Sequence, residues 1–224
     1  MFDAISRFVS LYGDLFVEGT IATLVMVTVS TAVAYVFGIL IAVVTTITAP
    51  GSLKPQPVLN AVLGWIINMG RSIPFIILIV ALIPFTRFIV GTSLGTLGAI
   101  VPLTIGAIPF VARMVESSFS EVSPGCIEAA QAFGANTFQI IYKVFLKESL
   151  PSLIRGATIT YITLIGYSAM AGAVGAGGLG DIAIRFGYYR YQMDVLVATI
   201  VIIIVLVQLI QSISDVIARR IDKR

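Results

Sequence analysis

Few residues of this chain could carry out covalent or metal chemistry. The 224-residue sequence contains no histidine, and Cys126 is its single cysteine. Without histidine, the chain lacks the usual base for a serine or cysteine nucleophile and the commonest zinc ligand. A lone cysteine forms neither an internal disulfide nor a metal cluster. We therefore expect no catalytic residue, no metal site and no cofactor bound by this chain.

Two short motifs have the spacing of known chemical signatures, but their surroundings favour other roles. The G-x-G-x-x-G motif at 175–180 would bind a dinucleotide only after a strand in a βαβ unit. Here it follows an apolar stretch, which indicates a close-packed or flexible break at a helix end. The Gly-Tyr-Ser at 166–168 has no base nearby to activate the serine. The pattern G-x4-G-K-S/T is absent from the sequence, so we do not expect this chain to hydrolyse ATP.

A polar stretch at about 117–150 lies between two apolar segments and carries helix signals of its own. Ser123 can cap a first helix with Pro124 at its first position, and Gly134 can end it with a positive φ. Asn136 or Thr137 can cap a second helix. The predicted apolar face of that second helix comprises Phe138, Ile141, Tyr142 and Phe145. We interpret the stretch as a docking loop for a cytoplasmic protein; the alternative is an interfacial hairpin resting on lipid.

The composition of the chain is that of an integral membrane protein. Hydrophobic residues make up 58% of the sequence and charged residues only 11%, whereas a soluble domain carries about 25% charged residues. The net charge of +3 lies at the edges of apolar runs, which favours a topology signal over nucleic-acid binding. The first residues lack the basic region of a cleavable signal peptide, so the first long apolar run is interpreted as a retained span.

Five apolar segments are long enough to cross a membrane as helices. They cover about residues 21–44, 58–85, 97–115, 153–174 and 195–213. Apolar residues also recur at helical spacing within 1–17, which favours a helix lying in the membrane interface. No polar linker divides the sequence. We therefore predict an all-α integral membrane protein whose residues 1–224 form a single transmembrane domain.

The basic residues predict the orientation of the five helices. With the C-terminus in the cytoplasm, nine Lys and Arg residues fall inside and four outside. This places the N-terminus outside, the docking loop in the cytoplasm and an aromatic girdle at 186–191 on the outer surface. Arg71 belongs to neither count. It either extends to the cytoplasmic interface or faces the interior of a dimer and pairs with a carboxylate.

The docking loop resembles the EAA loop of ABC importer permeases. The residues that carry the resemblance are the Glu-Ala-Ala at 128–130, Gly134 after three further residues, and the apolar 144–146. Lys147 stands where the family has a proline. This difference affects only the geometry at the end of the second short helix. The resemblance implies that force is transmitted through Glu128, Ala129, Ala130 and Gly134.

Three other stretches resemble the permease subunit of bacterial methionine importers. They are RSIPF at 71–75, PFVARMVE at 109–116, and the segment from GYSAM at 166–170 through GAGGLG at 175–180. The resemblance implies a homodimer of this chain, two copies of a separate ATPase that uses ATP and Mg²⁺, and an external methionine-binding lipoprotein. It further implies alternating access, with residues 123–135 docked in a groove of the ATPase.

The predicted span at 153–174 contains more polar side chains than is usual for a membrane helix. It is the candidate wall of a transport pathway. A thioether and an aromatic ring suit the thioether of methionine. The predicted substrate-pathway residues are Tyr167, Ser168 and Met170. Ordinary helix packing is the alternative role for these side chains. The sequence also leaves open another amino acid or small organic cargo, and, from another class, a passive channel or membrane adaptor.

Overall fold

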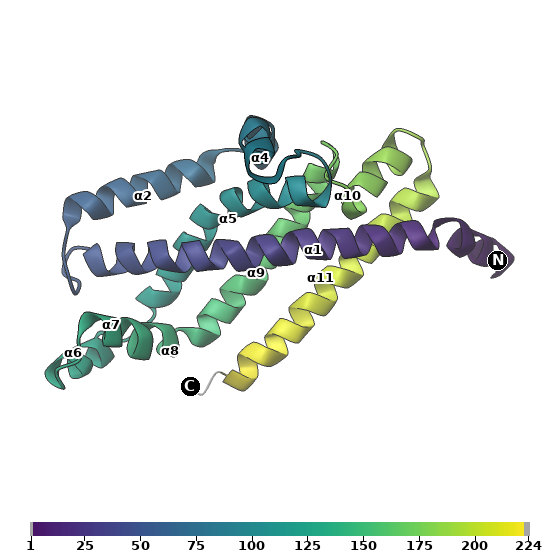
Figure 1. The fold of residues 1–224 in the computed structure, drawn as a ribbon. Coiled ribbons are helices and arrows are strands. Elements are labelled where there is room, and N and C mark those ends of the chain that lie inside the picture. The colour runs from purple at the N-terminus through teal and green to yellow at the C-terminus, as the bar shows by residue number, and fades with distance from the viewer. Residues whose placement is uncertain (1, 222–224) are drawn as a thin grey trace. The chain divides into compact units, whose positions relative to one another are not determined.

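The computed structural model describes residues 2–221, with side chains from residue 6 onward, and this part of the chain is helical without a strand. Four long helices account for most of it. They are α1 (Phe2–Thr48), α5 (Gly95–Ser120), α9 (Leu150–Gly172) and α11 (Met193–Ile221). Figure 1 shows α6, α7 and α8 as a group of short helices in the docking loop. Both the all-helical class and the helical docking loop therefore agree with the sequence.

Length and composition mark three helical stretches in the described residues as able to cross a membrane. They are Ser6–Thr48, Gly95–Ser120 and Met193–Ile221. Helices α2 (Pro57–Ser72) and α3 (Phe75–Ala81) would add a fourth if the bent pair is one span. Helix α9 is not among them, because Arg155 and several hydroxyl residues lower its mean hydropathy. The three stretches match three of the five predicted segments. The second predicted segment is bent by 98° between α2 and α3, and α9 passes on length alone.

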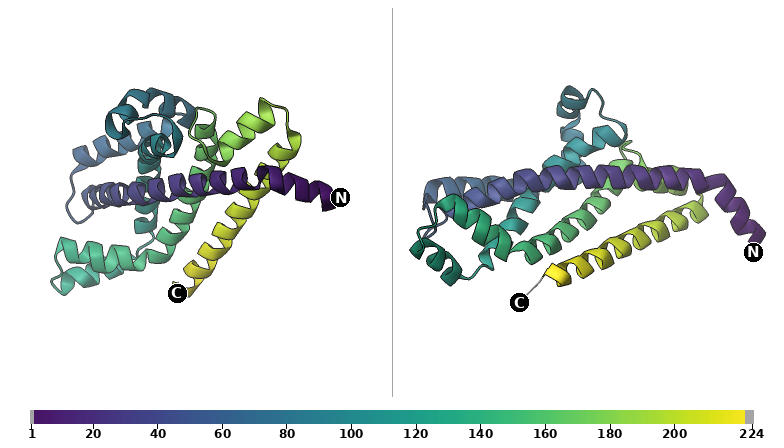
Figure 2. Two further views of the ribbon diagram at one scale, coloured as in Figure 1. Left: turned by 45° about the vertical axis from the view of Figure 1, so that its right-hand side comes forward. Right: turned by 60° about the horizontal axis from the view of Figure 1, so that its bottom comes forward.

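Helix α1 is longer than a bilayer is thick and runs without a break, as both views in Figure 2 show. Its apolar stretch of 43 residues is about 65 Å long, whereas the hydrocarbon core measures about 30 Å. The apolar stretch is thus about twice as long as one perpendicular crossing requires. No separate interfacial helix precedes the first span among the described residues, because residues 2–17 belong to α1 itself.

The chain forms two compact units. The first contains the described residues of Met1–Thr31 together with Pro74–Ile105 and Tyr161–Leu209. Phe16 from α1 packs there against Leu179, Ile182 and Val195, all of which are buried. These partners come from α10 (Gly178–Ile182) and α11. The apolar face predicted within residues 1–17 is therefore present, but it packs on protein instead of lipid. Phe2 and Ile5 also belong to this predicted face, and their side chains lie outside those described.

Proline shapes the start of the second segment of this unit. Ile73 is extended, with φ −80° and ψ 121°, because the ring of Pro74 disfavours helical geometry in the residue before it. Helix α3 therefore begins afresh at Phe75 and is followed by α4 (Ile83–Val90). Gly91, with φ +77°, ends α4 in the left-handed region, as glycine does at little cost.

The second unit contains Ala32–Ile73, Gly106–Thr160 and the described residues of Ile210–Arg224. Its helices approach closely at glycines. A Cβ added to Gly38 of α1 would lie 2.5 Å from Val111, and one added to Gly70 of α2 would lie 2.6 Å from Pro109. Both contacts are with α5, so the two glycines fix how near α1 and α2 pack to that helix. This unit carries the docking loop.

Candidate functional site

The first helix of the docking loop, α6 (Pro124–Ala132), begins and ends where the sequence predicts. It starts with proline after Ser123, although the serine side chain makes no capping hydrogen bond. At its other end Gly134, with φ +79°, donates its N–H to Gln131 at 2.9 Å. Ala135 donates to Ala130 at 3.0 Å. These two bonds form a Schellman motif, so the spacing between Glu-Ala-Ala and the glycine reflects a helix that must stop at one place.

The second helix starts at a capping box. Asn136 accepts from the N–H of Gln139 at 2.9 Å, and the Gln139 side chain accepts from the N–H of Asn136 at 2.9 Å. Helix α7 (Thr137–Ile140) then continues through a π-helical segment, η1 (Ile141–Phe145), into α8 (Leu146–Glu148). Of the two residues proposed as caps, the structure uses Asn136.

The predicted apolar face of this second helix is wrong in part. Ile140 and Phe145 are buried, at 1% and 6% exposed, whereas Phe138 and Tyr142 are 74% and 58% exposed. The two exposed rings stack on each other, with centroids 6.5 Å apart. The cause is the π-helical turn, which holds an extra residue and brings positions five apart onto one face.

The docking loop is anchored at the end of α5 and the start of α9. The ring of Phe145 lies 5.4 Å from that of Phe119 in α5. Ser152 at the start of α9 donates to Glu121 at 2.9 Å and lies 3.0 Å from the hydroxyl of Ser118. The docking loop is therefore in direct contact with α5 and α9. The sequence offered no sign of Phe119 as a partner, because its contact depends on a residue 26 positions away.

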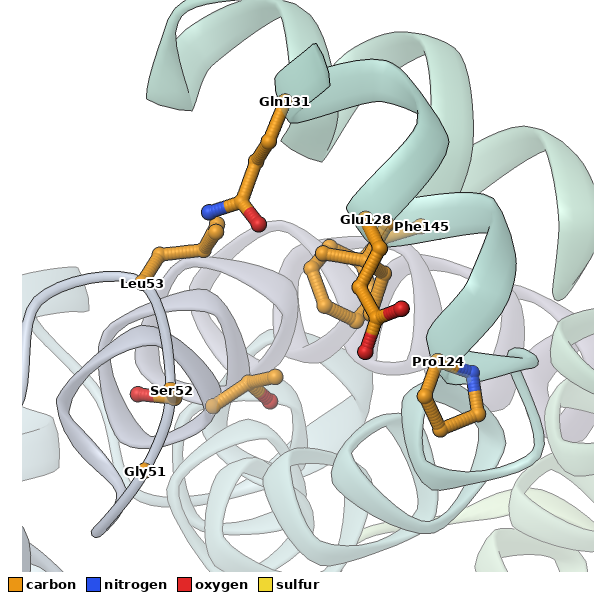
Figure 3. A pocket seen from close by; sticks show the side chains of 9 residues that line it. Gly51, Ser52, Leu53, Pro124, Glu128, Gln131 and Phe145 are labelled. Atoms are coloured by element: carbon orange, nitrogen blue, oxygen red, sulfur yellow. The ribbon is translucent and has the colours of Figure 1, made fainter.

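A pocket of about 250 Å³ lies between α6 and the turn that joins α1 to α2 (Figure 3). Figure 3 shows the Glu128 side chain extending from α6 into this space, which Leu53 and Phe145 also line. Two hydrogen bonds hold the turn: Asn60 donates to the carbonyl of Thr45 at 2.6 Å, and Ser52 donates to that of Ala49 at 2.7 Å.

The Glu-Ala-Ala residues occupy two sides of α6. Glu128 lines the pocket, Ala129 is exposed and Ala130 is half-buried, while Gly134 is exposed at the helix end. The structure thus brings all four predicted coupling residues to one short helix and its cap. A carboxylate beside two methyl groups gives a surface that another protein could approach closely.

The predicted substrate-pathway residues lie on α9 in the first unit and face different ways. The ring of Tyr167 stacks on Phe75 at 4.6 Å with planes 5° apart. Met170 is 48% exposed. Ser168 is buried and donates its hydroxyl to the carbonyl of Ile165 at 2.7 Å. Tyr167 and Met170 present surface, whereas the Ser168 hydroxyl is engaged within its own helix; Phe75 was not foreseen as a partner.

The charged residues of the second unit link helices to each other. Arg113 pairs with Glu116 at 2.6 Å and donates to Asn68 of α2 at 3.1 Å. The ion pair lies within α5, and the hydrogen bond from Arg113 to Asn68 connects α5 to α2. Arg71 is exposed in the last turn of α2, and no ion pair of it occurs in the part of the chain that the structure describes.

The glycine motif at 175–180 is a tight helix junction. A Cβ added to Gly180 would lie 2.4 Å from the Cα of Ala169, and one added to Gly178 would lie 2.6 Å from the hydroxyl of Thr23. The N–H of Leu179 donates to that hydroxyl at 2.9 Å. No strand precedes the motif in residues 2–221. Close packing accounts for Gly180 and a positive φ for Gly175 and Gly177, so the motif needs no nucleotide to explain it.

Comparison with known proteins places this geometry in a family. Residues 34–224 match the family described as the binding-protein-dependent transport system inner membrane component. The chain belongs to this family. Membership confirms the predictions of a transport permease rather than an enzyme and of a multi-pass protein of the inner membrane.

The similarity to individual family members extends over the full chain. The sequence is 51% identical over 223 residues to the probable D-methionine transport system permease protein MetI of Vibrio cholerae, covering 100% of this chain and 99% of that protein. It is 47% identical over 178 residues to the methionine import system permease protein MetP of Bacillus subtilis, covering 80% of each. A solved structure of the MetNI methionine ABC transporter in inward-facing conformations matches with a TM-score of 0.93 and 49% identity, over 95% of this chain and 98% of that one.

Proposed function

We propose that this chain is the permease subunit of an ATP-driven importer and forms the translocation pathway for methionine. The observation that carries the proposal is full-length similarity, at 51% identity, to a protein named as a D-methionine permease. The TM-score of 0.93 to a chain of a methionine ABC transporter supports it. The proposed pathway residues and the docking loop both lie within the matched region. We therefore infer both the cargo and the transport mechanism of this chain from the same relatives.

The proposed assembly contains two copies of this chain, two ATP-binding subunits and an external substrate-binding lipoprotein, all at a lipid bilayer. ATP and Mg²⁺ bind to the ATP-binding subunits, since this sequence has no phosphate-binding loop of its own. The family description, which names dependence on a binding protein, supports the external partner. The exposed coupling residues on α6 supply the surface for the ATPase.

We further propose that residues 1–224 act as one permease domain with five spans, an external N-terminus and a cytoplasmic C-terminus. In this proposal α9 is the fourth span in chain order, although its hydropathy alone does not mark it as one. Its buried Thr158 and Thr160 donate to the carbonyls of Ile154 and Gly156 at 3.0 and 2.9 Å. Hydroxyls satisfied within the helix cost little in a membrane. The excess of basic residues in the proposed inner segments supports the orientation.

The docking loop transmits force in this proposal. ATP binding brings the two ATPases together, and each pushes on α6. Since Phe145 packs on Phe119 and Ser152 bonds to Glu121, the push reaches α5 and α9 within the same unit. Rigid-body motion of these helices then opens the pathway outward, and hydrolysis resets it. Tyr167, Ser168 and Met170 on α9 would lie along that pathway.

Uptake of labelled methionine, measured in cells with and without this chain, tests the cargo. We expect deletion to lower uptake, and only methionine and its close analogues to compete. Co-purification of an ATPase with the tagged chain tests the importer mechanism separately. Unchanged uptake together with a co-purifying ATPase would refute methionine as the cargo but keep the importer mechanism. Unchanged uptake without a co-purifying ATPase would refute the proposed function.

A further inference from the structure

A pocket of about 190 Å³ in the first unit lies apart from the docking loop and from Tyr167. It is formed between α1 and the segment from α10 to η2 (Ala183–Tyr188), at the proposed outer end of both. Its charged lining consists of Glu18, Asp181 and Arg185, and Leu15 supplies an apolar wall. Nothing in the transport mechanism described above uses these three charges.

Glycines hold the walls of this pocket at a fixed distance. Gly19 of α1 faces Ile182, whose Cδ1 would lie 2.4 Å from an added Cβ. Gly178 has φ +79° and packs on Thr23, which also accepts the N–H of Leu179. At both positions the glycine lets α1 and α10 approach more closely than a residue with a side chain would allow.

Arg185 is positioned by two contacts. One guanidinium nitrogen lies 3.0 Å from a carboxylate oxygen of Asp181, and the guanidinium carbon lies 5.0 Å from the ring centre of Phe186. The residue belongs to the π-helical segment η2, and such turns often occur at functional sites. A guanidinium has five N–H donors in a fixed plane, so the single contact with Asp181 leaves donors for an anionic group.

Glu18 supplies a negative charge without a protein counterion. It is exposed, and it forms no ion pair within the described residues. With Asp181 already paired to Arg185, the lining carries two carboxylates against one guanidinium. The pocket therefore offers an acceptor for an ammonium group beside donors for an anion.

We propose that this pocket binds a zwitterion in which a primary ammonium lies next to an anionic group. Glu18 accepts hydrogen bonds from the ammonium, and Arg185 donates to the anionic group. Two sources carry this chemistry, the phosphoethanolamine headgroup of a membrane lipid and a free amino acid. Because Gly177 and Gly178 line the pocket, an occupant there contacts the junction between α9 and α10.

Calorimetric titration of the purified full-length transporter in detergent tests the proposal with three probes. They are short-chain phosphatidylethanolamine, phosphatidylcholine with the same acyl chains, and free methionine. The choline headgroup has no N–H to donate to Glu18, so it controls for the lipid tails. We expect Glu18→Gln and Arg185→Gln each to weaken binding of the correct probe about tenfold, as loss of a charged hydrogen bond does.

Arg190→Gln is the matched control, because Arg190 also lies over the Phe186 ring, at 4.6 Å, but does not line the pocket. We expect it to bind as the wild type does. Loss confined to phosphatidylethanolamine in the two pocket variants identifies a lipid headgroup, and loss confined to methionine identifies the amino acid. Equal affinity of wild type and both variants for every probe overturns the proposal. So does a lack of binding of both phosphatidylethanolamine and methionine. The titration requires no uptake, so its failure is distinct from failure of the import function.

Discussion

At the scale of single residues, backbone conformation sets the docking loop apart more than side-chain chemistry does. Gly134 has φ +79° and closes α6 through the Schellman bonds of its own N–H and that of Ala135. An L-residue with a Cβ is strained in this region, and a β-branched one most of all. The glycine therefore fixes where α6 ends, two residues before the capping box of α7.

Gly134→Val is expected to uncouple ATP hydrolysis from uptake. The left-handed backbone costs an L-residue about 1–2 kcal/mol, so the helix end should shift instead. The measurement is methionine taken up per ATP hydrolysed in proteoliposomes. Gly134→Asn is the matched variant, because asparagine tolerates this backbone, and it should keep most of the coupling. A normal ratio for the valine variant would refute a coupling role for this helix end.

Met170→Ala is expected to raise the KM for methionine by up to about tenfold while leaving assembly intact, because thioether contacts contribute about 0.3–1.5 kcal/mol. Met170 is 48% exposed on α9. Met193→Ala, at an exposed methionine outside α9, is the control and should transport as wild type does. Identical kinetics for the two variants would remove Met170 from the pathway.

At the scale of elements, the junctions between helices are specified by large buried rings and by glycines. Phe145 and Phe119 join the docking loop to α5. Gly180 brings α10 against α9. Rings transmit displacement because packed interiors have little compressibility. Glycines determine how close two backbones come.

Phe145→Ala is expected to destabilise the protein by about 3–5 kcal/mol, since it leaves a cavity under the docking loop. Tyr142→Ala removes a ring of similar size three residues earlier that is 58% exposed, and should have a small effect. Thermal unfolding of the two purified variants makes the comparison. Equal melting temperatures would show that Phe145 does not anchor the loop.

Gly180→Ala is expected to prevent stable folding, because its Cβ would lie 2.4 Å from backbone atoms of Ala169. Gly166→Ala is the matched control on α9, where an added Cβ meets nothing within 4 Å. Yield and melting temperature after purification in detergent report the difference. Wild-type stability of the Gly180 variant would contradict the close junction.

At the scale of the whole molecule, hydropathy and charge are distributed as a bilayer requires. The apolar window of α11 is only 11% buried within the chain, which leaves most of it for lipid or a second copy. Arginine and lysine gather in the proposed inner segments. The proposed orientation in the membrane places those segments in the cytoplasm. The accessibility of a single residue in one of them can therefore test it.

The single cysteine gives a direct test of orientation. Cys126 is exposed at α6, and a membrane-impermeant thiol reagent should label it in inside-out vesicles but not in right-side-out ones. In a Cys126→Ser background, Arg190→Cys should show the reverse pattern. Labelling of Cys126 from the outer side would invert the proposed topology.

The sequence by itself determined the membrane class, three of the five candidate spans and both ends of α6, because these follow from local composition and backbone preference. Only the tertiary structure decided which side chains meet. Local periodicity could not reveal the π-helical turn that buries Ile140 and exposes Phe138. Nor could it show that Phe8 and Phe16 pack on α10 and α11 rather than on lipid. An apolar face specifies only that it must leave water, and its partner is fixed by residues far along the chain.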